Sequence, residues 1–178
     1  GLPDDTIEID PSQGEAFWVR GRLNLRLGAV KDALKSLEKA VALKPTLTDA
    51  YANIAECYSQ LSRIKDAITA YGVALEKNAG RGDWWFELGK LQMNADKRAD
   101  AIKSLDKSVE IGELIERKPF WVAEAHRWRG EAARLGRDMA TAKKSYLRYL
   151  ELAPKEHVDR PEVLSVLRKM GVTPPEEE

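Results

Sequence analysis

The sequence predicts an all-α protein built from four helix–turn–helix repeats and one further helix near its C-terminal end. Three observations predict this fold class: residue columns that recur every 34 positions, apolar residues at helical spacing within each period, and no alternating strand pattern with hairpin turns. The 178 residues, 43% of them hydrophobic, are enough for one domain, or two at most, with a sizeable core.

The repeat is visible in four independent columns of residues. In each column two steps of 34 residues are followed by one step of 41, so a seven-residue insertion precedes the fourth repeat. The columns are Gly21, Ala55, Gly89 and Gly130; Ala33, Ala67, Ala101 and Ala142; Phe17, Tyr51, Trp85 and His126; and Leu37, Tyr71, Leu105 and Tyr146. The small residues permit the two helices of a repeat to approach closely, with large neighbours filling the space around them.

The period also sets the expected boundaries. Residues 1–13 form the tail of a preceding repeat, 14–47, 48–81, 82–115 and 123–156 are the four repeats, 116–122 are the insertion, 157–171 form a capping helix, and 172–178 form a flexible tail. Pro11 lies 34 residues before Pro45, which ends the first repeat, so we expect the chain to continue upstream as part of a longer protein. A capping helix beginning near Pro161 and ending at Gly171 would cover the last apolar face of the array.

The insertion, residues 116–122, leaves two structures open. Ala99 to Ile115 can continue as a helix without a proline until Pro119, so a lengthened second helix is the simplest account and an irregular loop is the alternative. In both cases Phe120 and Trp121 are expected at the joint between the third and fourth repeats, where packing the joint is their favoured role.

The pattern within each period resembles the tetratricopeptide repeat (TPR) family. The first repeat carries the family pattern at Phe17, Gly21, Ala33, Leu37, Ala40 and Pro45. The fourth repeat departs from it at His126 and Tyr149, where the family prefers an aromatic and a small residue. The resemblance implies a TPR solenoid, a right-handed αα superhelix, in which the first helices of successive repeats line a concave groove that binds partners.

Transferring that groove to this chain gives the expected partner-binding residues. They are Trp18, Arg22, Arg26, Asn53, Glu56, Phe86, Glu87, Lys90, Arg127, Trp128 and Arg134. The aromatic rings are expected to be exposed anchors, the arginines to contact acidic or carbonyl groups, and Asn53 to pair with partner backbone. The alternative is that the rings fold back onto neighbouring helices. A subset of the family clamps the C-terminal carboxylate of chaperone tails, but only Asn53 agrees with that pattern, so a chaperone-tail receptor is not expected.

Catalytic and cofactor chemistry are not expected. Cys57 stands alone, and neither His126 nor His157 has a histidine or cysteine at metal-ligand spacing, so we expect no enzyme, no cofactor and no metal. Lys plus Arg (29) equals Asp plus Glu (29), and this balance argues against nucleic acid as a partner. No run approaches the roughly 20 apolar residues that membrane insertion needs. The single cysteine and the absence of a readable targeting segment slightly favour the cytoplasm.

The sequence therefore predicts a non-catalytic protein–protein interaction module, a scaffold or adaptor that binds a peptide or protein along the concave groove. Two alternatives stay open. One is a structural module for self-association, and the other is the docking arm of a larger enzyme.

Overall fold

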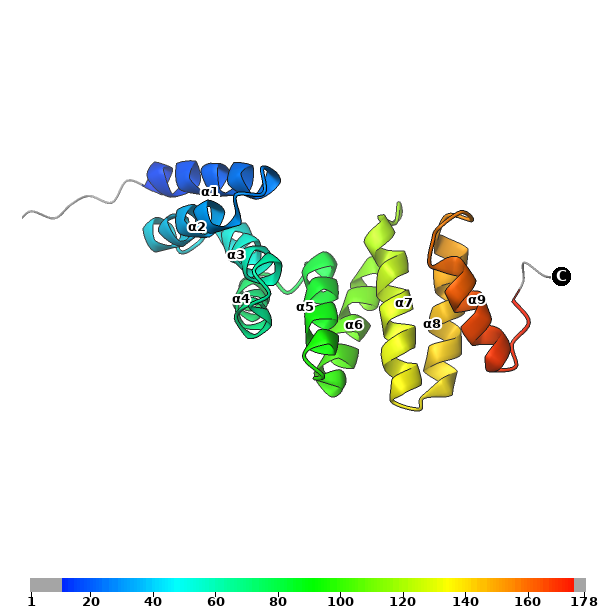
Figure 1. Ribbon diagram of the computed structural model, residues 1–178. Coiled ribbons are helices and arrows are strands. Elements are labelled where there is room, and N and C mark those ends of the chain that lie inside the picture. Colours follow the sequence, from blue (N-terminus) through cyan, green and yellow to red (C-terminus); the bar gives the residue numbers. More distant parts are fainter. Residues whose placement is uncertain (1–10, 175–178) are drawn as a thin grey trace, which may run out of the picture. The chain divides into compact units, whose positions relative to one another are not determined.

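The computed structural model describes residues 11–174, and within this range the chain forms nine α-helices and no strand (Figure 1). The chain divides into two compact units, residues 1–78 and 79–178. The predicted all-α fold of paired helices is confirmed. Most of the expected tail of a preceding repeat, and the last four residues of the expected C-terminal tail, lie outside the described residues.

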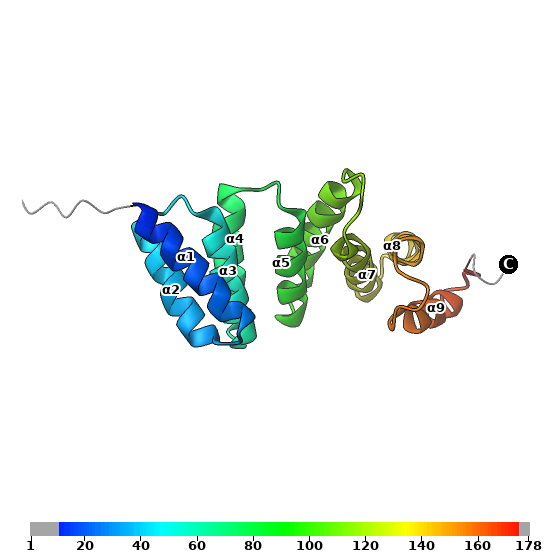
Figure 2. The ribbon, with the colours of Figure 1, turned by 90° about the horizontal axis from the view of Figure 1, so that it is seen from above.

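The first unit consists of two helical pairs. Its helices are α1 (Pro11–Arg26), α2 (Val30–Leu43), α3 (Thr48–Gln60) and α4 (Ile64–Lys77). Helix α1 packs against α2 and α3 against α4, and α3 also packs against α2 (Figure 2). A core of Ala33 and Leu37 from α2 and Ala50, Ile54 and Cys57 from α3 joins these two helices, and partly buried residues of α1 and α4 pack against it.

The second unit contains two further pairs and the capping helix. Its helices are α5 (Gly82–Asn94), α6 (Arg98–Glu113), α7 (Phe120–Leu135), α8 (Met139–Leu152) and α9 (Arg160–Lys169). Helix α9 buries Val163 and Leu167 against Tyr149 and Leu150 of α8, as expected of a cap. None of the helices in residues 11–174 is both long enough and apolar enough to cross a lipid bilayer.

The close approach of paired helices has the predicted cause. A Cβ atom at Gly21 would lie 2.6 Å from Cγ of Leu37, and one at Gly89 would lie 2.7 Å from Cγ of Leu105. At Gly130 the added atom would lie 2.8 Å from Cδ1 of Tyr146. The glycine column therefore faces the column of large residues directly, and a larger side chain at these places would force the pair apart.

The turn between the helices of each pair contains one residue in the left-handed region. These residues are Gly28 (φ 74°), Ser62 (φ 58°), Asp96 (φ 56°) and Arg137 (φ 64°), at the spacing of the repeat. Only the first is the glycine that this conformation favours, and each of the others costs roughly 1–2 kcal/mol. Helix packing therefore determines the turn, whatever residue stands there.

The insertion forms an irregular connector rather than only a longer helix. Helix α6 ends at Glu113, residues 114–119 have no helix, and α7 starts at Phe120 with 16 residues, against 13 in α3 and α5. A Cβ atom at Gly82 would lie 2.6 Å from Cη2 of Trp121, so this ring packs the joint. Phe120, in contrast, is 44% exposed.

A partly buried carboxylate fastens the connector to three helices. Glu113 at the end of α6 accepts hydrogen bonds from Nε and Nη2 of Arg148 at 2.7 and 2.8 Å, and Nε2 of His126 lies 2.9 Å from the same carboxylate. The ammonium of Lys118 lies 3.5 Å away. The hydrogen bonds from Arg148, followed by that from His126, lower the pKa of Glu113 to about 2.

The last turn of α8 is capped by a buried guanidinium. Arg160, the first residue of α9, is only 2% exposed. Its Nη1 donates hydrogen bonds to the carbonyl oxygens of Leu150 at 2.6 Å and Ala153 at 2.9 Å. The cation thus satisfies carbonyls at the end of α8 and complements the negative end of its dipole.

We expect Gly21→Leu to destabilise the first unit by about 1–3 kcal/mol, because the new side chain overlaps Leu37. The matched variant is Gly72→Leu in α4, where an added Cβ has no neighbour within 4 Å. That change should stabilise by about 0.5–1 kcal/mol, because leucine is a better helix former than glycine. Chemical denaturation of both variants measures the difference, and equal midpoints would contradict the helix packing described above.

We expect Glu113→Gln to lower the free energy of unfolding by about 1–2 kcal/mol at neutral pH, after allowance for solvent screening. Since folding lowers the pKa of Glu113, its contribution is present above the unfolded pKa and is lost as the pH falls from about 5 towards 2. The stability curves of the parent and the variant should therefore converge in acid. Glu110→Gln, at an exposed residue of the same helix, is the control, and parallel curves for the Glu113 variant and its parent would contradict the role of the network.

Candidate functional site

The first unit holds a tryptophan in a fixed orientation on the face shared by α1 and α3. The indole Nε1 of Trp18 donates a hydrogen bond to Oδ1 of Asn53 at 2.9 Å. The ring is half-buried against the core of the unit, and the guanidinium of Arg22 lies over it, 5.0 Å from its centre. Two of the predicted site residues are thus brought into direct contact, one from each helix.

Two arginines of α1 have no acidic partner in the part of the chain that the structure describes. Arg22 and Arg26 are exposed on α1 and form no ion pair there. Glu56 is also exposed and accepts a hydrogen bond from Gln60 on its own helix, at 3.2 Å. The face shared by α1 and α3 therefore presents a half-exposed ring, an amide and the guanidinium of Arg22, and Arg26 is exposed at the end of α1.

The expectation of an exposed ring at Phe86 is wrong. Its side chain is 6% exposed and packs in a core with Leu105, Val109, Ala125 and Ala132. The neighbouring predicted residues, Glu87 and Lys90, interact with each other. Lys90 forms an ion pair with Glu87 at 2.8 Å, and its ammonium lies 4.5 Å from the centre of the Phe86 ring.

The predicted arginines of α7 are neutralised by carboxylates of their own unit. Arg127 donates to Glu124 at 2.7 and 3.2 Å and lies 3.4 Å from Asp159. Arg134 donates to Glu131 at 2.6 and 2.9 Å. These hydrogen bonds lower the pKa of Glu131, so the carboxylate stays ionised and the pair stays intact.

A hollow next to these arginines has a wall that the repeat pattern did not predict. Its volume is about 170 Å³. The residues lining it are Arg127, Trp128, Glu131, Tyr146, Glu162, Val163 and Val166. Three of them come from the capping helix, whose face towards α7 cannot be aligned with any repeat. Tyr146 belongs to a core column, yet its hydroxyl donates to Glu131 at 2.7 Å, and it therefore takes part in the site.

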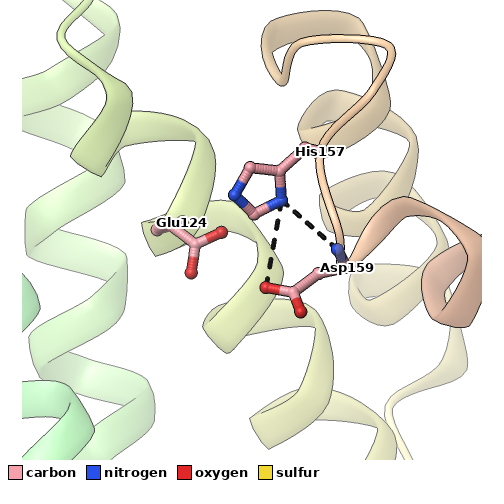
Figure 3. Close-up of side chains that lie close together, drawn as sticks. All are labelled: Glu124, His157 and Asp159. Carbon is pink, nitrogen blue, oxygen red and sulfur yellow. Dashed lines mark hydrogen bonds and ion pairs between the residues drawn. The ribbon is translucent and has the colours of Figure 1, made fainter.

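Three groups able to bind a metal lie close together at the start of the capping segment, as Figure 3 shows. Glu124, His157 and Asp159 offer ligand atoms within 4.8 Å of one another. Their existing contacts favour a structural role, because Arg127 lies against both carboxylates and the hydroxyl of Tyr149 lies 2.9 Å from Nδ1 of His157. The cluster fastens the segment before α9 to α7 and α8.

Comparison with solved structures identifies the fold. MamA is a similar structure, with 25% sequence identity and a TM-score of 0.70 over 80% of this chain and 79% of that one. The structure of pilF from Pseudomonas aeruginosa has 19% identity and a TM-score of 0.72 over 89% of this chain and 70% of that one. The first TPR of Spaghetti (RPAP3), bound to an HSP90 peptide, has 16% identity and a TM-score of 0.64 over 74% of this chain and 98% of that one. The model of the bacterial transcriptional activator domain, itself a helical repeat-like domain, matches residues 8–77. No curated protein sequence matches the chain significantly.

The agreement covers both the sequence period and the structure. The repeat columns, the paired helices of both units and the TPR structures among these neighbours lead to the same assignment. The chain has the fold of a tetratricopeptide repeat solenoid.

Proposed function

We propose that the chain is a non-catalytic protein-interaction module that binds a peptide or protein segment on the faces of its first helices. The observation that carries the proposal is the Trp18–Asn53 contact with Arg22 over the ring. Tryptophan and arginine are the residue types that most often supply binding energy at protein interfaces. Holding the ring in one orientation before binding reduces the entropy lost on association.

The polar groups around Trp18 suit an extended peptide. The Asn53 oxygen already accepts from the indole, so its amide N–H groups serve the carbonyl groups of a partner. Arg22 and Arg26, which have no carboxylate partner in the described residues, suit acidic side chains. In the second unit the ring of Trp128 lines the hollow between α7 and α9.

The cysteine and the two histidines of the described residues are protonated or held by other side chains. Burial raises the pKa of Cys57 to about 12, so its thiol stays protonated. His126 is tied to Glu113, and His157 to Tyr149. These contacts support a binding role rather than a chemical one.

We expect Trp18→Ala to weaken binding by at least about 2 kcal/mol while leaving the fold intact. Peptides selected from a random library on the immobilised protein supply the ligand, and fluorescence anisotropy measures the affinity. Tyr51→Ala on α3 is the control, because it should lower the melting temperature before it affects binding. Unchanged affinity of every selected peptide for the Trp18 variant would exclude the α1–α3 face as the binding surface.

One observation favours self-association as a second function. Val19 and Leu23 on α1, and Leu27 directly after the end of this helix, lie four residues apart and are 58%, 55% and 72% exposed. Cys57, one period after Leu23, is fully buried in the core that α3 shares with α2. An apolar ridge at this place therefore suits a covering helix, which a second copy of the chain can supply.

If copies associate through this ridge, Leu23→Glu should shift the average mass in light scattering towards the monomer over a concentration series. Leu114→Glu, at a residue that is 84% exposed in the connector of the second unit, should leave the mass unchanged. A monomeric mass for the parent protein at every concentration would rule out this second function and leave the first untouched.

A further inference from the structure

We propose that a second hollow of the 79–178 unit binds an acidic segment of a partner protein, with a carboxylate at two lysines and an apolar side chain beside it. The proposal rests on the interaction function above and specifies the chemistry of the partner. The hollow has a volume of about 540 Å³ and lies among the ends of α7 and α9 and the start of α8. Its lining residues are Arg134, Met139, Lys143, Val166, Lys169 and Met170.

The lining has three cations and no carboxylate. Arg134 is compensated by Glu131. Lys143 and Lys169, in contrast, form no ion pair within residues 11–174. Two ammonium groups without an ion pair in the described residues, lining one hollow, favour an anionic ligand.

Helix electrostatics explain two of these cations and leave one unexplained. Arg134 and Lys169 stand in the last turns of α7 and α9, where a cation complements the helix dipole. Lys143 lies in the second turn of α8, nearer to the positive end of that helix, and gains nothing from the dipole. It is also partly buried. A partner carboxylate would supply the charge-assisted hydrogen bond that this ammonium lacks.

The apolar half of the hollow requires an apolar group next to that carboxylate. Met139 is 43% exposed, and Val166 and Met170 are partly buried. Methionine side chains adapt to varied apolar ligands. Val166 also lines the hollow that contains Trp128, so one extended segment can lie along both.

Glu176, Glu177 and Glu178 of the same chain are acidic as well. The experiment therefore includes a deletion that distinguishes the chain's own C-terminal residues from a separate partner.

The three methionines of the chain provide a direct test, since Met139 and Met170 line the hollow and Met93 packs beside Phe86 in the same unit. Protein with carbon-13 methionine methyl groups is titrated with a synthetic decapeptide of alternating glutamate and leucine pairs. We expect saturable shifts of the Met139 and Met170 signals. The double variant Lys143→Glu, Lys169→Glu should weaken binding by about tenfold or more.

Two controls separate this site from general charge effects. Lys103→Glu, at an exposed residue of α6 outside the hollow, should leave the affinity unchanged, and a peptide with glutamine in place of glutamate should not bind. Equal binding of that peptide, or of the double variant with an unchanged helical spectrum, would overturn the proposal.

Other outcomes are equally decisive. No shift of Met139 and Met170 would overturn the proposal. A shift of Met93 alone would overturn it too but leave the interaction function standing, because the peptide would then lie beside Phe86. If deleting residues 175–178 shifts Met139 and Met170 without peptide, the occupant is the chain's own tail rather than a partner.

Discussion

The contact on which both units depend is a small residue facing a large one across each helical pair. Gly21 against Leu37 and Gly130 against Tyr146 leave no room for even a Cβ atom, so the two helices meet at a fixed depth. Fixing that depth also fixes which side chains of the first helix point away from its partner. The exposed positions of α1 are a consequence of this packing, whereas the hollows beside α7 also require the capping helix α9.

The fold could be predicted because this contact repeats in the sequence. A glycine or alanine every 34 residues, opposite a large apolar residue, determines the pairing of helices with little help from the rest of the chain. The turns needed no prediction, since Ser62, Asp96 and Arg137 adopt the left-handed conformation that packing demands. The end of α6 was harder to predict, because residues 114–119 contain no proline before Pro119 to mark where the helix stops.

The candidate site could be predicted only in part. A column of the repeat tells which way a residue points from its helix, but not how large its neighbours are. Trp18 meets Asn53 at its edge and stays half-exposed, whereas Phe86 is enclosed by α6 and α7. The carboxylates that neutralise Arg127 and Arg134 are also local matters, decided by the residues three positions away on α7. The face of the capping helix has no counterpart in any repeat, so its contribution was visible only in the structure.

The buried guanidinium of Arg160 has a consequence for how such an array can change in length. Arg160 belongs to α9 but donates to carbonyl groups at the end of α8, so the end of the last pair depends on the capping helix. Inserting a duplicated pair directly after α8 would separate the cation from those carbonyls and leave them bare in an apolar setting. A pair inserted between α2 and α3 would leave this contact of Arg160 intact. Lengthening the array at its C-terminal end would therefore require α8 and α9 to be duplicated together.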